Sequence, residues 1–458
     1  MSVNKIIILA FISLCLAFGA CRKFISIPPP ETQAQTSIIF ENDQAAIAAA
    51  TGLYSQIMSA SLGITNGGTT LYPALSADEI YNTASNSDYD AFRSNEITLN
   101  ATGLNRLWTF GYRNIYHANA VLEGLVASTG ITDSIRKQLR GEMLVTRALH
   151  YFILVNMYGE IPLVKTTSFQ TNQILPRSTL PEVHTFIMND LLEAKTLLKD
   201  SYPSAGRVRP NKFAATALLA RFYLYSKQWQ LAEQEATEVI NNTQYSLVTN
   251  LNNVFLANSA EAIWQFMPVT SIASTSEGNT FIPTSATTRP AFAFTPQLLA
   301  AFETSDQRKA NWTKMVTISG QPYTYPFKYK VRTATPPPTE NYMVLRLAEV
   351  YLNRAEARME QNNIAGAQQD LNRVRTRAGL SNTTANTQDQ LRIAIMQERR
   401  IELMTEWGHR WFDLKRWEKA HEILSAIKTP GWQSTDVLYP ISQYDLDTNP
   451  FLEQNPGY

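Results

Sequence analysis

The chain contains an internal repeat in which a helix, a short polar turn and a second helix occur twice. Aligning Ala220 with Ala355 brings the two copies into register without a gap. The matched positions are then Trp229 with Ile364, Ala232 with Ala367, Ala236 with Leu371, and Val239 with Val374. Small residues at helical spacing let two antiparallel helices approach closely, as in tetratricopeptide-type helix pairs. The repeat therefore predicts an all-α scaffold of tetratricopeptide-like helix pairs.

Two copies of such a repeat do not bury a core by themselves, so further helices have to stack onto them. Apolar residues recur at steps of three and four over residues 43–58, 107–125, 135–158 and 391–404. This spacing is typical of amphipathic helices. We expect the helices at 135–158 and 391–404 to pack directly against the two repeats.

The beginning of the chain has the pattern of a lipoprotein signal. Lys5 precedes an apolar stretch over residues 6–18, and the small residues Gly19 and Ala20 follow it. An apolar stretch of this length is shorter than the roughly 20 residues that span a bilayer. We expect a signal peptide at residues 1–20, with Cys21 as the first mature residue and the acceptor of a lipid.

A tether and a single folded body are expected after the signal peptide. Three prolines at residues 28–30 favour polyproline II and cannot continue a helix, so residues 21–40 read as a tether. Residues 41–458 form one domain in this interpretation. The other cysteine, Cys15, lies within the apolar stretch, so no disulfide framework is expected. With 40 basic and 39 acidic residues, the chain has no global field that would attract nucleic acid.

Two long stretches, residues 63–101 and 268–338, interrupt the helical pattern and are rich in Thr, Ser and aromatic residues. Long loops on a rigid scaffold are frequent sites of binding, and aromatic faces stack on sugar rings or apolar side chains. The candidate ligand-binding residues are Tyr72, Asp78, Tyr81, Tyr89 and Arg93 in the first stretch, and Phe281, Arg289, Phe292, Phe294, Trp312 and Tyr323 in the second. For each single residue the alternative is packing that anchors the loop.

Catalytic motifs are not recognisable in the sequence. The histidines share no metal-ligand spacing, and neither a phosphate-binding loop nor a Gly-x-Ser-x-Gly motif occurs. Asp78 and Glu79 form a carboxylate pair of the kind that glycosidases use, but pairs of this sort arise by chance in a chain with 39 acidic residues. We therefore expect a binding protein that is not an enzyme and uses no metal or cofactor.

Residues 398–417 combine arginines, carboxylates and tryptophans, a composition that is also found in ligand-binding sites. Arginine and carboxylate side chains three or four residues apart on a helix pair with each other, and Trp411 and Trp417 would bury beside them. We favour a structural cluster of ion pairs and aromatic rings that closes the helical array over a ligand-binding role.

Several segments, in the same order along the chain, resemble the SusD/RagB family of outer-membrane nutrient-binding lipoproteins. They are residues 21–24 (CRKF) with 28–30 (PPP), 147–152 (RALHYF) with 157–164 (MYGEIPLV), 345–357 (LRLAEVYLNRAEA), 398–400 (ERR) with 410–417 (RWFDLKRW), and 438–441 (LYPI) with 455–458 (NPGY). The resemblance implies four tetratricopeptide-like helix pairs, with the irregular segments gathered on one side. It also implies a surface-exposed lipoprotein that forms a lid over a SusC-like TonB-dependent transporter in the outer membrane.

The function implied by the resemblance is that the protein binds a nutrient without catalysing a reaction. The family binds oligosaccharides, or peptides in some members, and its ligand contacts vary, so none is transferred here residue by residue. Three interpretations stay open: a glycan-capture subunit, a peptide-capture subunit of the same type of complex, and a helical-repeat assembly scaffold without a small ligand. The long aromatic stretches argue against the third.

Overall fold

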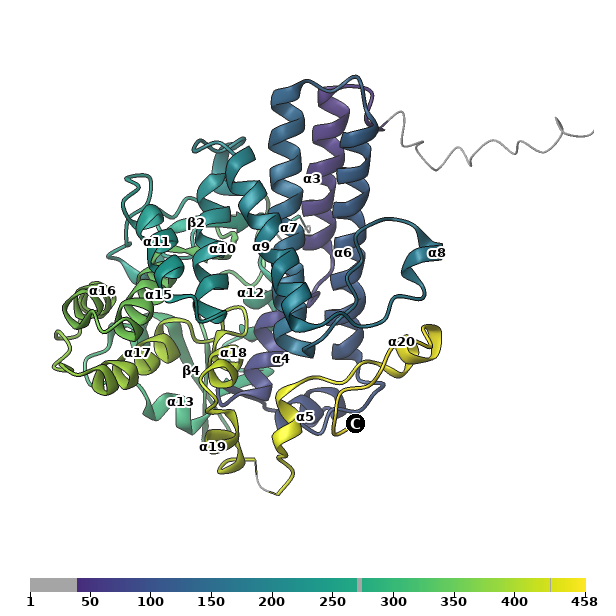
Figure 1. The fold of residues 1–458 in the computed structure, drawn as a ribbon. Helices are drawn as coiled ribbons and strands as arrows, with labels where there is room; N and C mark the ends of the chain where they lie inside the picture. Colours follow the sequence, from purple (N-terminus) through teal and green to yellow (C-terminus); the bar gives the residue numbers. More distant parts are fainter. Residues whose placement is uncertain (1–38, 270–273, 429) are drawn as a thin grey trace, which may run out of the picture.

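The computed structural model of the protein describes residues 39–269, 274–428 and 430–458 (Figure 1). The expected signal peptide, the lipid acceptor Cys21 and the tether up to residue 38 lie outside the described residues. The described chain is mostly helical, with a few short strands, as the repeat predicts.

The internal repeat is confirmed as two helix pairs whose helices begin at equivalent positions and whose turns have the same geometry. The first pair is α10 (Lys212–Tyr225) with α11 (Trp229–Ile240), and the second is α15 (Leu347–Glu360) with α16 (Ile364–Arg377). Lys227 and Asn362 occupy equivalent turn positions in left-handed conformation, with φ of 58° and 61°. The residue after each donates its N–H over 2.8 Å to the carbonyl five residues earlier, which satisfies a carbonyl at the helix end. The two pairs stack through α11 and α15.

A third turn of the same form occurs near the end of the chain, where sequence similarity does not reveal it. It joins α18 (His409–Arg416) to α19 (Ala420–Ser425). Glu418 has a φ of 59°, and Lys419 donates its N–H to the carbonyl of Leu414 over 2.8 Å. The backbone geometry of the turn is thus repeated although the side chains differ.

The long helices stand side by side and form the upper part of the molecule in Figure 1. They are α3 (Asp43–Ser59), α6 (Thr102–Ala127), α7 (Asp133–Tyr158) and α9 (Leu180–Leu197). Helix α7 packs against α6, α9 and α3, and α9 packs against α10, so the bundle continues into the repeats. The helix α17 (Gln388–Glu402) packs against α15 and α16. These positions confirm the four helices expected outside the repeats.

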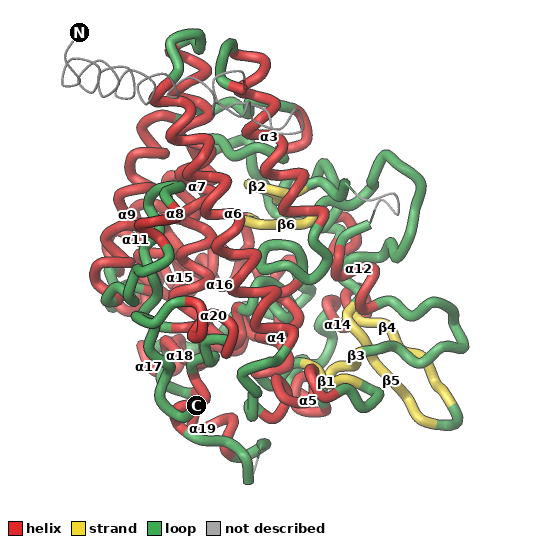
Figure 2. Tube along the Cα trace, turned by 90° about the vertical axis from the view of Figure 1, so that its right-hand side faces the viewer, coloured by secondary structure: helices red, strands yellow, loops and turns green. Residues whose placement is uncertain are grey.

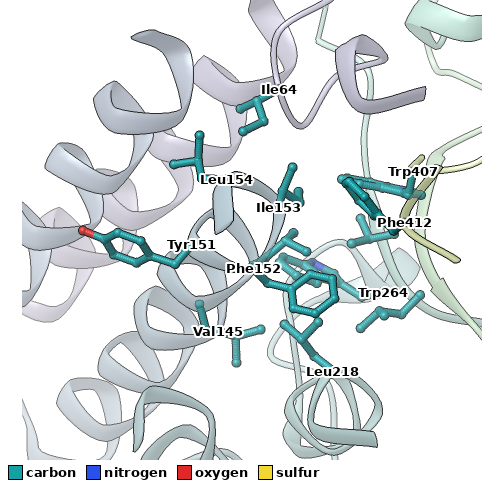
Figure 3. Close-up of a cluster of buried hydrophobic side chains, with 14 of the residues drawn as sticks. Ile64, Val145, Tyr151, Phe152, Ile153, Leu154, Leu218, Trp264, Trp407 and Phe412 are labelled. Atoms are coloured by element: carbon teal, nitrogen blue, oxygen red, sulfur yellow. The ribbon is translucent and has the colours of Figure 1, made fainter. Parts of the chain in front are cut away.

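The hydrophobic core joins the helical bundle to the C-terminal part of the chain. Figure 3 shows Phe152 and Ile153 of α7 beside Leu218 of α10 and Trp264, with Trp407 and Phe412 approaching from the C-terminal side; all are buried. Burying one large apolar side chain contributes about 1.5–3 kcal/mol, so a core shared by distant segments holds them as one unit.

The two irregular stretches contain more regular structure than the sequence predicts. The first holds α4 (Gly68–Ser76), β1 (Ile80–Asn82) and α5 (Ser87–Ser94). The second holds α12 (Ser276–Phe281), β3 (Phe292–Phe294), α13 (Pro296–Ala300), α14 (Gln307–Trp312), β4 (Thr313–Ile318) and β5 (Gln321–Pro326). Every residue of α4 is buried, so it lies inside the protein and is not a surface loop. A helix buried on all sides shows no amphipathic period, which is why the pattern fails there.

The two stretches meet each other across a short antiparallel ladder. Strand β1 pairs with β3, with Ile80 opposite Phe294 and Asn82 opposite Phe292. Strands β4 and β5 form a hairpin that packs beside β3 and projects from the molecule in Figure 2. Segments about 200 positions apart in the sequence are therefore brought to one side of the fold, as the resemblance implies.

Other elements connect these parts. Strand β2 (Ala262–Phe266) pairs with β6 (Tyr342–Arg346). The remaining short helices are α8 (Phe169–Asn172), α20 (Gln443–Thr448) and the 3-10 turns Ala205–Arg207, Leu251–Asn253 and Ser434–Val437. None of the helices in the described ranges is long and apolar enough to cross a bilayer.

The arginine- and carboxylate-rich segment at residues 398–417 belongs to a buried network of ion pairs. The carboxylate of Glu402 accepts hydrogen bonds from Arg308 (3.0 Å), Arg346 (2.5 Å) and Arg377. Burial opposes ionisation of Glu402, but these guanidinium groups hold its pKa well below the usual range. All four side chains are almost fully inaccessible, so the structure supports the structural interpretation of this segment.

Candidate ligand-binding site

A pocket of about 880 Å³ opens at the end of the molecule where the two irregular stretches meet the C-terminal part. Its walls come from the end of α4, from β1 and α5, from the start of α13, and from the segment that follows α19. The lining includes Asp78, Tyr81, Asp90, Arg93, Glu96 and Lys428. Three of the sequence-predicted candidates, Asp78, Tyr81 and Arg93, therefore line one pocket.

Tyr81 and Arg93 form the aromatic and cationic part of the wall. Tyr81 lies on β1, which its pairing with β3 holds in place, and Arg93 lies on α5. The Arg93 guanidinium carbon is 5.7 Å from the centre of the Tyr81 ring, within cation–π range. Tyr81 is partly accessible and Arg93 is exposed. The pair presents a ring and several N–H donors to the pocket.

Tyr323 extends this surface toward the β4–β5 hairpin. Burial raises the pKa of the Tyr81 hydroxyl, and Tyr323 on β5 raises it further, although Tyr323 is not among the residues that line the pocket. Tyr323 is partly accessible. The structure thus relates Tyr81 and Arg93 of the first stretch to Tyr323 of the second.

The carboxylate of Asp78 supports the pocket wall through ion pairs inside the protein. It accepts hydrogen bonds from Arg410 over 2.7 and 2.9 Å and from Arg400 over 2.6 Å. Burial opposes ionisation, but the hydrogen bonds from Arg410 and the charge of Arg400 hold the pKa of Asp78 below its usual value. Asp78 is buried and its oxygens are occupied, so its candidate role as a direct ligand contact is corrected to that of a wall residue.

Lys428 is a pocket residue that the sequence analysis does not identify. Its ammonium group donates to the carbonyls of Leu75 (3.1 Å) and Ser76 (2.5 Å) and to the side chain of Asn95 (2.5 Å). A cation at the C-terminal end of α4 is favourable for the carbonyls and the helix dipole there. Burial lowers the pKa of Lys428 to about 7. A lysine in a run of short turns carries no signal that would distinguish it from a surface residue.

The remaining wall of the pocket is polar. Asp90 accepts hydrogen bonds from the side chain of Asn82 (2.8 Å) and the backbone N–H of Asn86 (2.9 Å), which fixes the start of α5. Ser87, Ser94, Glu96 and Gln297 also line the pocket. Hydroxyl, amide and carboxylate groups around a single aromatic ring can hydrogen-bond a ligand that carries many hydroxyl or amide groups.

The other predicted aromatic residues lie in the core, and the structure corrects their assignment to an accessible platform. The exposed fractions are 1% for Tyr72, 4% for Phe281, 2% for Phe292, 2% for Phe294 and 0% for Trp312. The irregular stretches build a small hydrophobic core of their own, and its aromatic residues are the ones that the composition singles out.

Trp312 shows why these aromatic residues are part of the core and not of a ligand-binding surface. Its indole N–H donates to the carbonyl of Leu251 over 3.0 Å, and the ammonium group of Lys328 lies 4.6 Å from its ring. Phe292 packs edge-on against Tyr89 at 4.9 Å between ring centres. These rings are occupied by neighbours within the protein, so they have no face to offer a ligand.

The last two predicted residues lie outside the pocket lining. Tyr89 is half-buried between Phe292 and Tyr72, which makes it an anchor of α5. Arg289 is exposed in the loop before β3. The accessible candidates that remain for a ligand surface are Tyr81, Arg93 and Tyr323, with Arg289 at some remove from the pocket.

The carboxylate pair Asp78 and Glu79 does not form an exposed catalytic pair. Glu79 is buried and accepts the N–H of Thr405 over 3.0 Å, and burial raises its pKa to about 8. Asp78 is engaged by arginines, as described above. Within the described parts of the chain, no group of three or more His, Cys, Asp or Glu residues is arranged to hold a metal ion.

The fold and the pocket together define a helical-repeat protein with a pocket that is lined mainly by irregular insertions. A family model described as "SusD family" matches residues 276–458, and one described as "Starch-binding associating with outer membrane" matches residues 31–224. The chain belongs to the SusD/RagB family. Carbohydrate binding and outer-membrane association are thus characteristic of the family to which it belongs.

Individual relatives and solved structures agree with this assignment. SusD-like protein P25 of Formosa agariphila is 25% identical over the full length of both chains. The starch-binding protein SusD of Bacteroides thetaiotaomicron is 32% identical over 29% of this chain and 24% of its own. A SusD superfamily structure from Bacteroides vulgatus has the same fold, with a TM-score of 0.82 at 21% identity, covering 92% of this chain and 100% of that one. A laminarin-binding SusD-like protein aligns with a TM-score of 0.77 at 25% identity, covering 91% and 100%.

Proposed function

We propose that the protein captures oligosaccharides at the cell surface and delivers them to a SusC-like TonB-dependent transporter in the outer membrane. The observation that carries the proposal is the pocket that Tyr81 and Arg93 line, with Tyr323 acting on Tyr81 from the neighbouring strand β5. An aromatic ring supplies a flat face for a sugar ring, and the polar wall supplies hydrogen-bond partners for hydroxyl groups. Binding alone is sufficient for capture, so no catalytic group is required.

Two relatives support carbohydrate as the ligand class. One is named for binding starch and another for binding laminarin, both glucose polymers. We extend the ligand class of these two relatives, a polysaccharide, to this chain. An extended polymer contacts the pocket through several sugar units, and several weak contacts together give useful retention.

The position of the pocket also supports capture from outside the cell. The described chain begins at Ile39, at the upper end of α3 in Figure 1, whereas α5, α13 and α19 lie at the opposite end of the molecule. A lipid on Cys21 would hold the end that carries the tether near the membrane. The pocket would then lie at the end remote from the point of attachment.

A peptide ligand is the second candidate. Arg93 and Glu96 line the same pocket and present charges of both signs, which suits the termini or side chains of a peptide. The polar wall is equally able to bind peptide groups. The choice between the two ligand classes is therefore a matter for direct measurement.

The test uses the full lipoprotein purified in detergent and titrated by calorimetry with laminarin, starch oligosaccharides and a peptide digest. We expect saturable binding of an oligosaccharide, weakened about three- to tenfold in Tyr81→Ala and in Tyr323→Ala by the loss of one aromatic contact. Tyr444→Ala, an exposed tyrosine on another face, is the matched control and should bind like wild type. Saturable binding of peptides alone would establish the second candidate, and glycan binding that both tyrosine variants leave intact would place the site elsewhere.

A further inference from the structure

The strongly exposed aromatic side chains of the described chain gather on one flank, away from the pocket lining. They are Tyr116 (44% exposed), Phe169 (69%), Tyr444 (68%) and Phe451 (54%). Ile174, 52% exposed, lies in the same loop as Phe169. Exposed apolar side chains scattered singly are normal on soluble proteins, but several on one surface mark an interaction site. We call the surface of these five residues the aromatic flank.

Hydrogen bonds fix the segments of the aromatic flank to one another. The loop that carries α8 lies along α6, where Tyr112 donates to the carbonyl of Pro162 and Asn119 to that of Val164, both over 2.9 Å. Tyr116 lies between Tyr112 and Asn119 on the same face of α6, at helical spacings of four and three.

The C-terminal segment is held against the same loop. Asn449 donates to the carbonyl of Leu175 over 2.8 Å, and Arg177 donates to the carbonyl of Glu453 over 3.0 Å. Both views show α8 and α20 on one side, at the right edge in Figure 1 and facing the viewer in Figure 2. The segments that carry the aromatic flank are therefore anchored to one another on one side of the fold.

Acidic groups outnumber basic ones beside the aromatic flank, where Lys165 and Arg177 lie in the loop that carries α8. Residues 442–458 contain Asp445, Asp447 and Glu453 and neither lysine nor arginine. Glu123 adds a carboxylate on α6, where it accepts from Thr167. An acidic rim is repelled by anionic lipid headgroups. It is complementary to a protein surface whose rim carries lysine or arginine, and interfaces between proteins are typically an apolar centre enriched in Tyr and Phe within a polar rim.

We propose that the aromatic flank is the surface on which the transporter docks, through an apolar patch rimmed by basic residues on the transporter. The proposal rests on the proposed function, which supplies the partner. Aromatic side chains at the centre of the contact would supply most of the binding energy, and the acidic rim would orient the partner. The aliphatic Ile174 fits an apolar protein contact, since it offers no flat face to a sugar ring.

The test keeps the lipoprotein at full length in the outer membrane of its own cells and isolates the transporter through an affinity tag. We expect wild type to co-purify with the transporter and the double variant Phe169→Ser/Tyr444→Ser to co-purify at least tenfold less. Ile393→Ser and Met315→Ser, which remove side chains 69% and 60% exposed on α17 and β4, are matched controls and should behave like wild type. The charge reversal Asp447→Lys should weaken the association without removing any apolar contact.

Each outcome separates this inference from the function on which it rests. Undiminished co-purification of the double variant would overturn the aromatic flank as the docking surface while leaving delivery to the transporter intact. Failure of wild type itself to co-purify would overturn delivery, and this inference with it.

Two further measurements on the double variant complete the test. Oligosaccharide affinity unchanged from wild type supports docking, whereas its loss would reassign the flank to ligand binding and overturn the proposal. Concentration-dependent self-association of wild type in light scattering, abolished in the double variant, would assign the flank to a second copy of the chain instead.

Discussion

At the scale of single residues, the fold depends on charged groups that are buried with complementary partners. Asp78 is the clearest case, because its carboxylate joins two arginines of the C-terminal signature to the loop before β1. Removing one partner of a buried pair leaves the other charge without compensation. Sequence motifs that look like a binding site can therefore be the parts of the molecule that hold it together.

Replacement of Asp78 by alanine should destabilise the protein by about 3–5 kcal/mol, because Arg410 and Arg400 would keep their charges in a largely buried place. The measurement is the free energy of unfolding in denaturant. Glu96→Ala removes an exposed carboxylate from the same pocket and should change it by no more than about 0.5 kcal/mol. Equal effects of the two substitutions would contradict the structural role of Asp78.

Glu79 should make stability depend on pH in the opposite sense to an ion-paired acid. Burial raises its pKa to about 8, against about 4.3 for an unfolded glutamate. Between these values the folded protein retains a proton that the unfolded chain has released, so the contribution of Glu79 to stability falls as pH rises from about 4.5 to 8.

The substitution Glu79→Gln keeps an oxygen that can accept the N–H of Thr405 and removes the titration. The stability of the variant relative to wild type should therefore rise with pH over this range, by up to about 1.4 kcal/mol per pH unit. Asp78, Arg410 and Lys328 also act on Glu79 and are present in both proteins, so their own titrations largely cancel in the difference. If the difference in the free energy of unfolding between Glu79→Gln and wild type did not change between pH 5 and 8, the prediction would be refuted.

At the scale of elements, the sequence predicts helices well where one face is buried and poorly where all faces are. Residues 43–58 and 135–158 are predicted within two positions of α3 and α7, because their apolar residues form one stripe. Helix α4 is missed because none of its residues is exposed to give a polar face. Helix α9 is different: Val183, Ile187, Leu191 and Ala194 carry a readable period, which the sequence analysis does not use.

The candidate site, too, is predicted from the sequence only in part. Aromatic content locates the right stretches, but it carries no information on the direction of a side chain, so Trp312 and Phe292 are core residues. Tyr81 and Tyr323 are accessible because they lie on short strands at the edge of that core. Lys428 depends on the tertiary arrangement alone, since its partners are carbonyls and an amide far away in the sequence.

Two glycines in helices should respond in opposite ways to replacement by alanine. Both substitutions gain helix propensity of about 1 kcal/mol. A β-carbon at Gly52 in α3 meets no atom within 4 Å, so Gly52→Ala should stabilise the protein by about 0.5–1 kcal/mol. A β-carbon at Gly103 in α6 would lie 2.5 Å from the rings of Phe92 and Tyr72, so Gly103→Ala should destabilise it by about 1–3 kcal/mol.

The measurement for this pair is the midpoint of thermal or chemical unfolding, with helical signal as the probe. The contrast tests whether α6 is packed against the core formed by the first irregular stretch. Stabilisation by both substitutions would mean that the rings beside Gly103 move aside, and that this core is looser than the structure has it.

At the scale of the whole molecule, the helical repeats and the pocket have separate tasks. The repeats and the long helices form one continuous core, whereas the pocket is built from insertions that meet at one end and fasten to the C-terminal ion pairs. Such an arrangement lets the insertions vary in sequence without disturbing the scaffold. It accounts for a family in which the fold is recognisable at low identity while the bound polymers differ.

A lipid on Cys21 would limit how far the folded body lies from the membrane. Between Cys21 and residue 38 an extended chain reaches at most about 60 Å, so a lipid on Cys21 would hold the protein beside the outer membrane. In our proposal this supports docking on the transporter, since the lipid keeps the local concentration of the protein high.

Replacement of Cys21 by alanine should leave a folded protein that binds its oligosaccharide with unchanged affinity in solution but no longer sediments with the outer membrane. Uptake of the oligosaccharide by the cells should fall, because the captured ligand would no longer be held beside the transporter. Fractionation, calorimetry and uptake of a labelled oligosaccharide measure the three effects separately. Cys15→Ala, a substitution within the expected signal peptide, is the control and should behave like wild type. Sedimentation of Cys21→Ala with the membrane at the wild-type level would refute the lipid anchor.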